Sequence, residues 1–293
     1  MKNAKKIKFL FTVLLSLLCF ITSCLYLLGD AKVYAATGSE TIYCDDLYGE
    51  NDYSGSGQGV DTSYDVYYDR MELTSVNHLS VPSFSNGNPS YNNACSPLAG
   101  LNIVGFYDRW STNLLAGYEP GLTFANGNFQ YYPTTNSTVV TNAFVSLYSL
   151  MKTGELGGTT SSNFKNGLNT YVKNAGYNIS YSSFYQGSNS VDLNKLKTAI
   201  DNNKVGLLMC SEYNFVYSIV FNDSCSHINK HNYTVGHMMM VYGYETYTYY
   251  KDNEVIGTDT FLNVCSSYPT GEKGYMQLYD YSKIEEALII SIA

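Results

Sequence analysis

The stretch YNNACSPLAGLNIVGFYDRW, residues 91–110, places a cysteine and a proline in front of an apolar run with helical periodicity. The apolar face of this predicted helix carries Ala99, Ile103, Phe106 and Trp110. Because proline is well tolerated in the first helical turn, we expect a helix over residues 97–110 with Cys95 or Ser96 at its cap. The free N–H groups and positive dipole at such a helix start would favour a thiolate on Cys95. A buried thiol or half of a disulfide are the alternative interpretations.

The rest of the chain divides into a helical part and a strand part. Helical periodicity also covers residues 142–154, 163–176 (with an internal Gly167) and 190–204. After residue 204 the pattern predicts strands over residues 205–210, 236–246, 260–268, 274–281 and 288–292. Helices followed by strands indicate an α+β fold in two halves.

The N-terminus has the pattern of a secretory signal. Lysines precede an apolar run over residues 9–28, and VYAA, residues 33–36, supplies small residues for cleavage after Ala35. We therefore assign residues 1–35 to a signal peptide and place the protein outside the cell or on its surface. The apolar run is also long enough for an uncleaved membrane anchor. ITSC, residues 21–24, resembles a lipoprotein cleavage box, but the apolar LYLL after it favours cleavage and release.

Residues 36–75 are acidic and rich in glycine, serine and tyrosine. The segment CDDLYGENDYSGSGQGVDTSYD, residues 44–65, contains no basic residue. This composition predicts a flexible arm, a short pro-segment or a spacer from the cell surface. Residues 76–293 would then form the main domain.

The charge balance limits the partners of this chain. The formal net charge is −8, and removal of residues 1–35 makes it more negative because that segment is rich in lysine. An acidic protein is repelled by phosphate backbones and anionic lipids, so we do not expect nucleic acid as a partner. Contact with a membrane is expected only through the signal segment, if it is not cleaved.

The cysteine count points to a reactive thiol. Cys19 and Cys24 lie in the predicted signal, which leaves an odd number in the exported part. These are Cys44, Cys95, Cys210, Cys225 and Cys265. At least one must stay unpaired within a monomer, while the others form disulfides or remain thiols.

A base for such a thiol must come from a short list of histidines: His78, His227, His231 and His237. His237 opens the apolar segment GHMMMVYGY and follows Cys95 by about 140 residues, a separation expected of papain-like peptidases. The alternative for His237 is a structural histidine at a strand end. CSHINKH, residues 225–231, together with His237 is a candidate zinc cluster, but we favour a flexible polar loop there and expect no metal.

Three segments resemble one family. NNACSPLAGLNIVGFYDRW is similar to the nucleophile segment of the bacterial papain-like cysteine peptidases related to the bacteriocin-processing (double-glycine leader) peptidases. The matching positions are Asn93, Cys95, Ser96, Pro97, Ala99, Gly105, Tyr107 and Asp108. KLKTAIDNNKVGLLM, residues 195–209, and VGHMMMVYGYET, residues 235–246, resemble the helix–strand and histidine segments of that family. The resemblance, from about residue 79 onward, implies a papain-like fold with an N-terminal helical half and a C-terminal antiparallel sheet half.

The resemblance also implies a role for each site residue. Cys95 would attack the carbonyl carbon of a peptide or protein substrate, and His237 would take the thiol proton and return it to the leaving amine. The Cys95 backbone N–H and a side-chain amide would hold the oxyanion, with no metal or organic cofactor. Because Pro89 stands where the family has glutamine, that amide would come from Asn88, Asn92 or Asn93.

The residue that orients the histidine departs from the family pattern of aspartate or asparagine. The corresponding stretch is FLNVCSSY, residues 261–268, where Ser266 matches the orienting position and Asn263 is the alternative. An odd offset on a strand turns these two side chains to opposite faces unless a bulge intervenes. The site is therefore either a Cys–His pair with weak support or a degenerate one.

We expect an exported cysteine peptidase of a Gram-positive bacterium that cleaves peptide bonds through a thioester. A catalytically degenerate papain-like module would instead bind a partner through tyrosine-rich segments such as GYETYTYY, residues 243–250, and FQYYP, residues 129–133. Cell-wall peptide amidases and transglutaminase-like enzymes use the same Cys–His pair and are further alternatives.

Overall fold

The computed structural model describes residues 40–43, 59–84, 90–118, 122–125, 128–131, 138–154, 158–267, 273–278 and 282–293. The predicted signal, residues 1–35, lies outside the described residues. The described helices are α2 (Cys95–Asp108), α3 (Thr138–Leu150), α4 (Ser161–Asn174) and α5 (Leu193–Asp201). The described strands are β1 (Glu40–Tyr43), β2 (Gly59–Tyr67), β3 (Arg70–His78), β4 (Leu122–Ala125), β5 (Asn128–Tyr131), β6 (Ile179–Ser183), β7 (Tyr185–Gly187), β8 (Ser190–Val191), β9 (Val205–Asn222), β10 (Cys225–Tyr233), β11 (His237–Lys251), β12 (Glu254–Cys265), β13 (Lys273–Gln277) and β14 (Lys283–Ile292). None of the described helices combines the length and hydropathy needed to cross a membrane.

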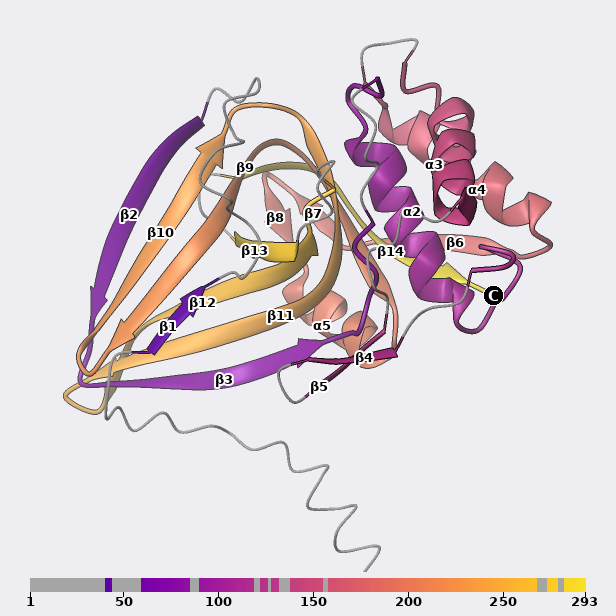
Figure 1. The fold of residues 1–293 in the computed structure, drawn as a ribbon. Coiled ribbons are helices and arrows are strands. Elements are labelled where there is room, and N and C mark those ends of the chain that lie inside the picture. The colour runs from indigo at the N-terminus through magenta and orange to yellow at the C-terminus, as the bar shows by residue number, and fades with distance from the viewer. Residues whose placement is uncertain are drawn as a thin grey trace, which may run out of the picture.

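A large antiparallel sheet organises the described part of the chain. Its strands follow the order β2-β10-β9-β13-β12-β11-β3, with β1 and β14 paired to β9 and β6 paired to β14. The first part of β9 pairs with β11 and β14, and its later part pairs with β10. Figure 1 shows α2, α3 and α4 gathered at one end of the molecule, while the long strands extend to the other.

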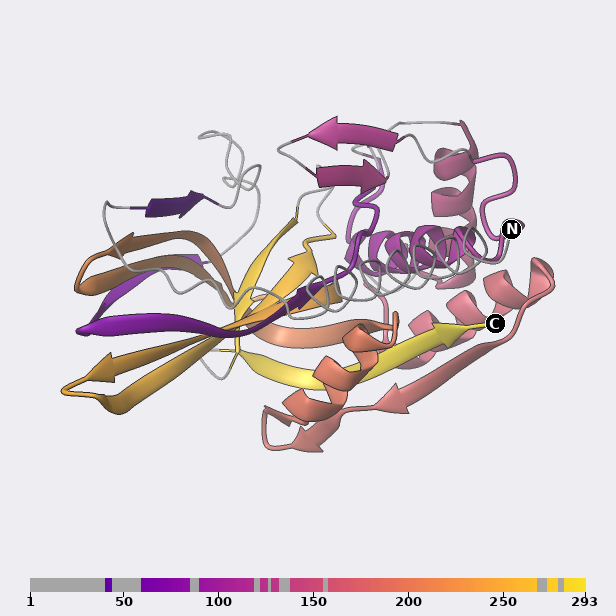
Figure 2. The ribbon, with the colours of Figure 1, turned by 90° about the horizontal axis from the view of Figure 1, so that it is seen from below.

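The central strands β9 and β11 are covered on both faces. Met238 and Met240 pack with α2, α3 and α4, whereas Met239 packs with α5 on the other side. Because side chains alternate across a strand, the buried run MMMV, residues 238–241, requires a helix on each face. Figure 2 shows α2 and α5 on opposite sides of these strands. Because α2 packs directly on β11, the start of β11 with His237 lies next to the start of α2.

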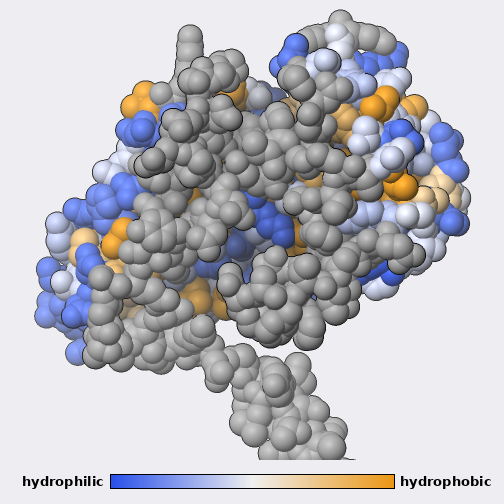
Figure 3. Space-filling model, viewed as in Figure 1, coloured by the Kyte–Doolittle hydropathy of each residue, from blue (hydrophilic) through white to orange (hydrophobic). Residues whose placement is uncertain are grey.

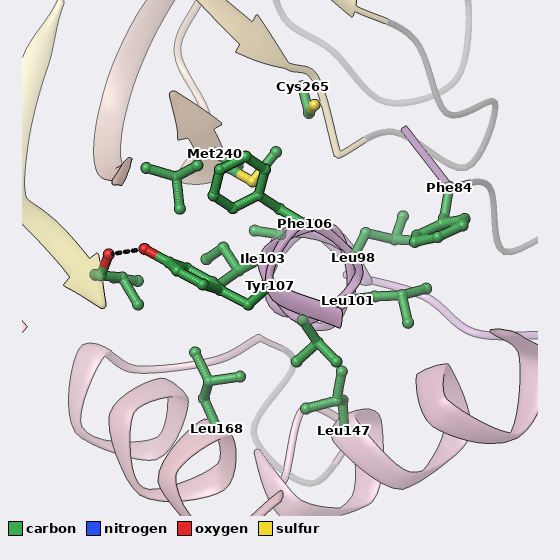
Figure 4. Close-up of a cluster of buried hydrophobic side chains, with 14 of the residues drawn as sticks. Phe84, Leu98, Leu101, Ile103, Phe106, Tyr107, Leu147, Leu168, Met240 and Cys265 are labelled. Carbon is green, nitrogen blue, oxygen red and sulfur yellow. Dashed lines mark hydrogen bonds between the residues drawn. The ribbon is translucent and has the colours of Figure 1, made fainter. Parts of the chain in front are cut away.

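α2 is the buried centre of the helical layer. Every residue of α2 after Cys95 is buried. Figure 4 shows its side chains meeting Met240 of the sheet on one side, Leu147 and Leu168 of α3 and α4 on another, and Phe84 on a third. The Tyr107 hydroxyl donates to the backbone oxygen of Ile290 at 2.5 Å, which joins α2 to β14. This packing leaves α2 little freedom to shift.

The ends of α2 differ from the sequence prediction. The helix begins and ends earlier than residues 97–110, so Trp110 lies beyond it and is 55% exposed instead of joining the apolar face. Trp110 lies under the Arg109 guanidinium, whose carbon is 4.6 Å from the ring centroid. The N-cap is Ala94, which makes no side-chain capping bond, and not Cys95 or Ser96. Cys95 is therefore the first helical residue.

The structure confirms the α+β class, with helices in the middle of the chain and a large antiparallel sheet in the C-terminal half. The expectation of an irregular arm over residues 36–75 is wrong for the described part, because β2 and β3 pair with β10 and β11. In β2, Thr62, Tyr64 and Val66 are less exposed than the residues between them. The acidic residues at the alternate positions hid this strand periodicity.

Candidate active site

Cys95 lies at the N-terminal end of α2 with its side chain half-buried. Asn93 adopts a left-handed backbone conformation (φ 55°) in the turn that leads into the helix. Because Ala94 provides no side-chain cap, the positive end of the helix dipole is not offset by a capping oxygen. The local structure therefore places the Cys95 sulfur where a negative charge is favoured.

His237 is the first residue of β11 and lies opposite Cys210 of β9 in the sheet register. Its imidazole stacks on the ring of Tyr213, with centroids 4.8 Å apart and planes inclined by 19°. Phe215 meets the same imidazole edge-on at 6.4 Å. His237 is only 7% exposed, so these aromatic rings restrict the orientation of its side chain.

The imidazole is also fixed by the main chain after β12. His237 Nε2 lies 2.5 Å from the backbone carbonyl oxygen of Ser266. Because a carbonyl oxygen can only accept, Nε2 carries the proton and Nδ1 is the nitrogen that remains to interact with a thiol. The following residue, Ser267, has a left-handed backbone (φ 58°), which marks an abrupt turn at the end of the strand.

Cys95 and His237 interact directly. Burial by itself raises the pKa of the Cys95 thiol, but a hydrogen bond from His237 and its charge act in the opposite direction. The Met238 backbone N–H and the Ser96 hydroxyl also stabilise the thiolate, and together these interactions hold the pKa of Cys95 below its ordinary value. This combination is the electrostatic environment of a reactive cysteine.

A cavity of about 360 Å³ opens beside the pair. Cys95 and His237 both line it, together with Asn93 before α2, Thr159 before α4 and Glu285 of β14. A space of this size next to a nucleophile can hold a few residues of a bound peptide. The arrangement can therefore bring a carbonyl group to the Cys95 sulfur.

The other residues named as candidates from the sequence lie in different places. Asn93 is exposed and lines the cavity, whereas the backbone oxygen of Asn92 accepts from the Tyr148 hydroxyl at 3.1 Å. Asn88 lies outside the described residues. Asn263 donates to Glu245 Oε1 at 3.2 Å, so its amide is engaged there. At Ser266 the backbone carbonyl oxygen accepts from His237 Nε2.

The CSHINKH segment is a strand and not a flexible loop. Residues 225–231 belong to β10, where His227 and His231 face β2. Nδ1 of His227 lies 2.5 Å from an Asp65 oxygen, and Nδ1 of His231 lies 2.6 Å from an Asp61 oxygen. Within the described ranges, no group of histidine, cysteine and acidic residues is placed to hold a metal ion.

The four described cysteines are Cys95, Cys210, Cys225 and Cys265, and all are free thiols. Burial, followed by the charge of Glu285, raises the pKa of Cys210 to about 12. Burial also raises the pKa of Cys265 to about 11 and that of Cys225 above its ordinary value. Cys95 is thus the one thiol among these whose pKa is lowered. Cys44 lies outside the described residues.

Sequence reasoning missed three contributors to the site: the ring of Tyr213, the N–H of Met238 and the carboxylate of Glu285. Tyr213 and Phe215 continue the alternation of the strand past Cys210, where the predicted strand ended, so extending that pattern would have found them. The backbone N–H and the position of Glu285 depend on register, which leaves no signal in the sequence.

No model of a known protein family matches the chain, and a comparison with curated proteins likewise finds no match.

Proposed function

We propose that this chain is an exported papain-like cysteine peptidase that hydrolyses peptide bonds, with Cys95 as nucleophile and His237 as base. The observation that supports it best is a thiol of lowered pKa at a helix start, paired with a histidine in one cavity. A central helix that begins at the cysteine and packs on an antiparallel sheet that supplies the histidine is also the arrangement implied by the family resemblance.

The chemistry follows from the tautomer of His237. Nδ1 accepts the thiol proton of Cys95, and the thiolate attacks the carbonyl carbon of the scissile amide. The tetrahedral intermediate collapses as the imidazolium protonates the leaving amine, which leaves a thioester on Cys95. His237 then removes a proton from water, and attack of that water releases the acid and the free thiol.

The start of α2 supplies donors for the oxyanion. The Cys95 N–H is among the first backbone N–H groups of the helix, which have no partner within the helix. Asn93, which lines the cavity, is the described asparagine best placed to add a second donor. Each such donor contributes about 3 kcal/mol to transition-state stabilisation.

The Ser266 carbonyl stabilises a protonated His237 less than a carboxylate would. The Ser266 carbonyl is a neutral acceptor, so it orients the ring but stabilises the imidazolium less than an aspartate would. The aromatic contacts of Tyr213 and Phe215 add orientation without charge. We therefore propose an active Cys–His pair whose third partner is the main chain.

Two observations count against the binding-module alternative. Tyr244, Tyr247 and Tyr249 of the tyrosine-rich segment are buried in β11, so they do not form a contact surface. On the described surface visible in Figure 3, hydrophilic residues predominate over the strand end and hydrophobic residues form small, separate patches. Tyr132 and Pro133 of FQYYP lie outside the described residues.

The test measures the rate at which iodoacetamide alkylates each cysteine of the folded protein, by mass spectrometry at neutral pH. Cys95 should react at least about tenfold faster than the other thiols. His237→Ala should abolish this selectivity, whereas the matched control His227→Ala should preserve it. In a peptide library, the wild type should create new termini, and Cys95→Ala should lower that rate by on the order of 10³-fold or more.

The outcomes separate the alternatives. Equal labelling of all thiols in the folded wild type would overturn the proposal in favour of the binding module. Fast labelling of Cys95 without new peptide termini would overturn peptide-bond hydrolysis in favour of another Cys–His chemistry, such as cell-wall amide hydrolysis or acyl transfer.

A further inference from the structure

Glu285 gives the cavity beside Cys95 a negative charge. Among the described residues that line this cavity, it is the one carboxylate, and no lysine or arginine is present. Glu285 is exposed and lies on β14, whereas Cys95 and His237 come from α2 and β11. A ligand that enters the cavity therefore meets one acidic group, on the side formed by β14.

A register shift brings Glu285 to this position. Ile284 pairs with Cys210 and Glu286 pairs with the adjacent Met209, so Glu285 is an extra residue in β14. A bulge of this kind changes the direction in which a side chain points. Glu285 and Cys210 line the same cavity, and the charge of Glu285 adds to burial in raising the pKa of the Cys210 thiol.

The neighbouring carboxylates form ion pairs with lysines, whereas Glu285 forms none within the described residues. Glu212 forms an ion pair with Lys283, and Glu286 forms one with Lys165 at 2.5 Å. Within the described part of the chain, Glu285 has no hydrogen-bond or ion-pair partner of its own. A cationic group of a ligand could therefore pair with the Glu285 carboxylate without displacing a lysine.

We infer that Glu285 selects substrates with a lysine or arginine side chain close to the scissile bond. This inference rests on the proposed peptidase function, since it names the substrate class of that site. A guanidinium or ammonium group would pair with the Glu285 carboxylate while the neighbouring peptide bond lies at the Cys95 sulfur. One partly exposed ion pair of this kind should change the preference by about fivefold.

The charge preference is tested first with a cationic, a neutral and an anionic methanethiosulfonate, each of which forms a mixed disulfide with Cys95. Glu285→Gln should lower the ratio of cationic to neutral reaction rates at Cys95 by about fivefold, with the neutral rate as the internal reference for any general change in thiol reactivity. Glu285→Lys should make the anionic reagent the faster one. Glu254→Gln, which removes the same charge from an exposed position at the start of β12, should leave all ratios unchanged.

The second measurement uses peptides that differ only in lysine or its uncharged isostere norleucine. The ratio of kcat/KM for the lysine peptide to that for the norleucine peptide should exceed one in the wild type and fall to about one in Glu285→Gln. Suppose that wild-type Cys95 reacts fast with the neutral reagent, but Glu285→Gln leaves the ratio of cationic to neutral rates unchanged. That result would overturn this inference and leave the peptidase proposal standing. A wild-type Cys95 that reacts slowly with the neutral reagent would overturn the peptidase proposal and this inference with it.

Discussion

The backbone of Ser266 orients His237, since the acceptor for Nε2 is the Ser266 carbonyl oxygen. A substitution that removes only the hydroxyl therefore leaves this bond in place, as long as the turn at Ser267 keeps the carbonyl directed at the imidazole. The orienting role at position 266 is therefore carried by the main chain.

Ser266→Ala should keep both fast alkylation of Cys95 and peptide cleavage close to the wild-type rates, because the carbonyl remains. The measurement is the alkylation rate at neutral pH together with cleavage per folded molecule. Asn263→Ala should behave in the same way, because its amide donates to Glu245. Loss of activity in a folded Ser266→Ala variant would show that the hydroxyl is the orienting group after all.

Tyr213→Leu should lower kcat by about ten- to hundredfold with a smaller effect on KM, because the imidazole loses the ring that fixes its plane. Tyr213→Phe keeps the ring and serves as the matched control with nearly unchanged kcat. Steady-state kinetics on one cleaved peptide provide the measurement. Equal kcat values for the leucine and phenylalanine variants would contradict a positioning role for the ring.

The alkylation of Cys95 should extend to lower pH than that of an ordinary thiol. A lowered pKa means that the thiolate persists as the pH falls, until the pH passes through that lowered value. Cys265, with a pKa of about 11, should react appreciably only in alkaline solution. The measurement is the alkylation rate of each cysteine against pH.

Replacement of His237 provides the control for this pH dependence. In His237→Gln, burial is no longer opposed by the imidazole, so the midpoint of the Cys95 profile should move to higher pH. A Cys95 profile that is the same in the wild type and in His237→Gln would mean that His237 does not stabilise the thiolate.

Gly167→Ala should destabilise the protein by about 1–3 kcal/mol, although alanine is the better helix former. A Cβ at this position would lie 2.8 Å from the Met151 backbone nitrogen, where α4 crosses the end of α3. Asn166→Ala, at an exposed neighbouring position on the same helix, should be neutral or slightly stabilising. Urea unfolding of both variants measures the difference, and an unchanged midpoint for Gly167→Ala would contradict the close packing.

The elements with strong periodicity could be predicted from the sequence. The helices that became α3, α4 and α5 have apolar stripes that a single sequence displays, α2 is an apolar run that is buried on every side, and the run MMMV indicated a buried strand. Their ends were less certain because burial extends past the stripe. Thus Trp110 looked like part of the α2 face, yet the helix had already ended at Asp108.

Strands that carry charges on one face could not be recognised in the same way. Asp61 and Asp65 in β2 match His231 and His227 in β10 across the register, so each segment looks like a polar loop until the other is beside it. The chemical pair Cys95 and His237 was visible from residue type and order. Its supports were not, because they are a carbonyl, an N–H group and a strand bulge.

The complete burial of α2 has a consequence for the order of events in synthesis. Tyr107 anchors α2 to Ile290 in β14, near the end of the chain, and β14 also completes the pairing of β9 and β6. A nascent or truncated polypeptide without β14 lacks this hydrogen bond and the pairing of β14 with β9, so we expect α2 to be held less firmly and Cys95 to be less reactive. Such incomplete copies should therefore be alkylated at Cys95 more slowly than the protein with β14 in place.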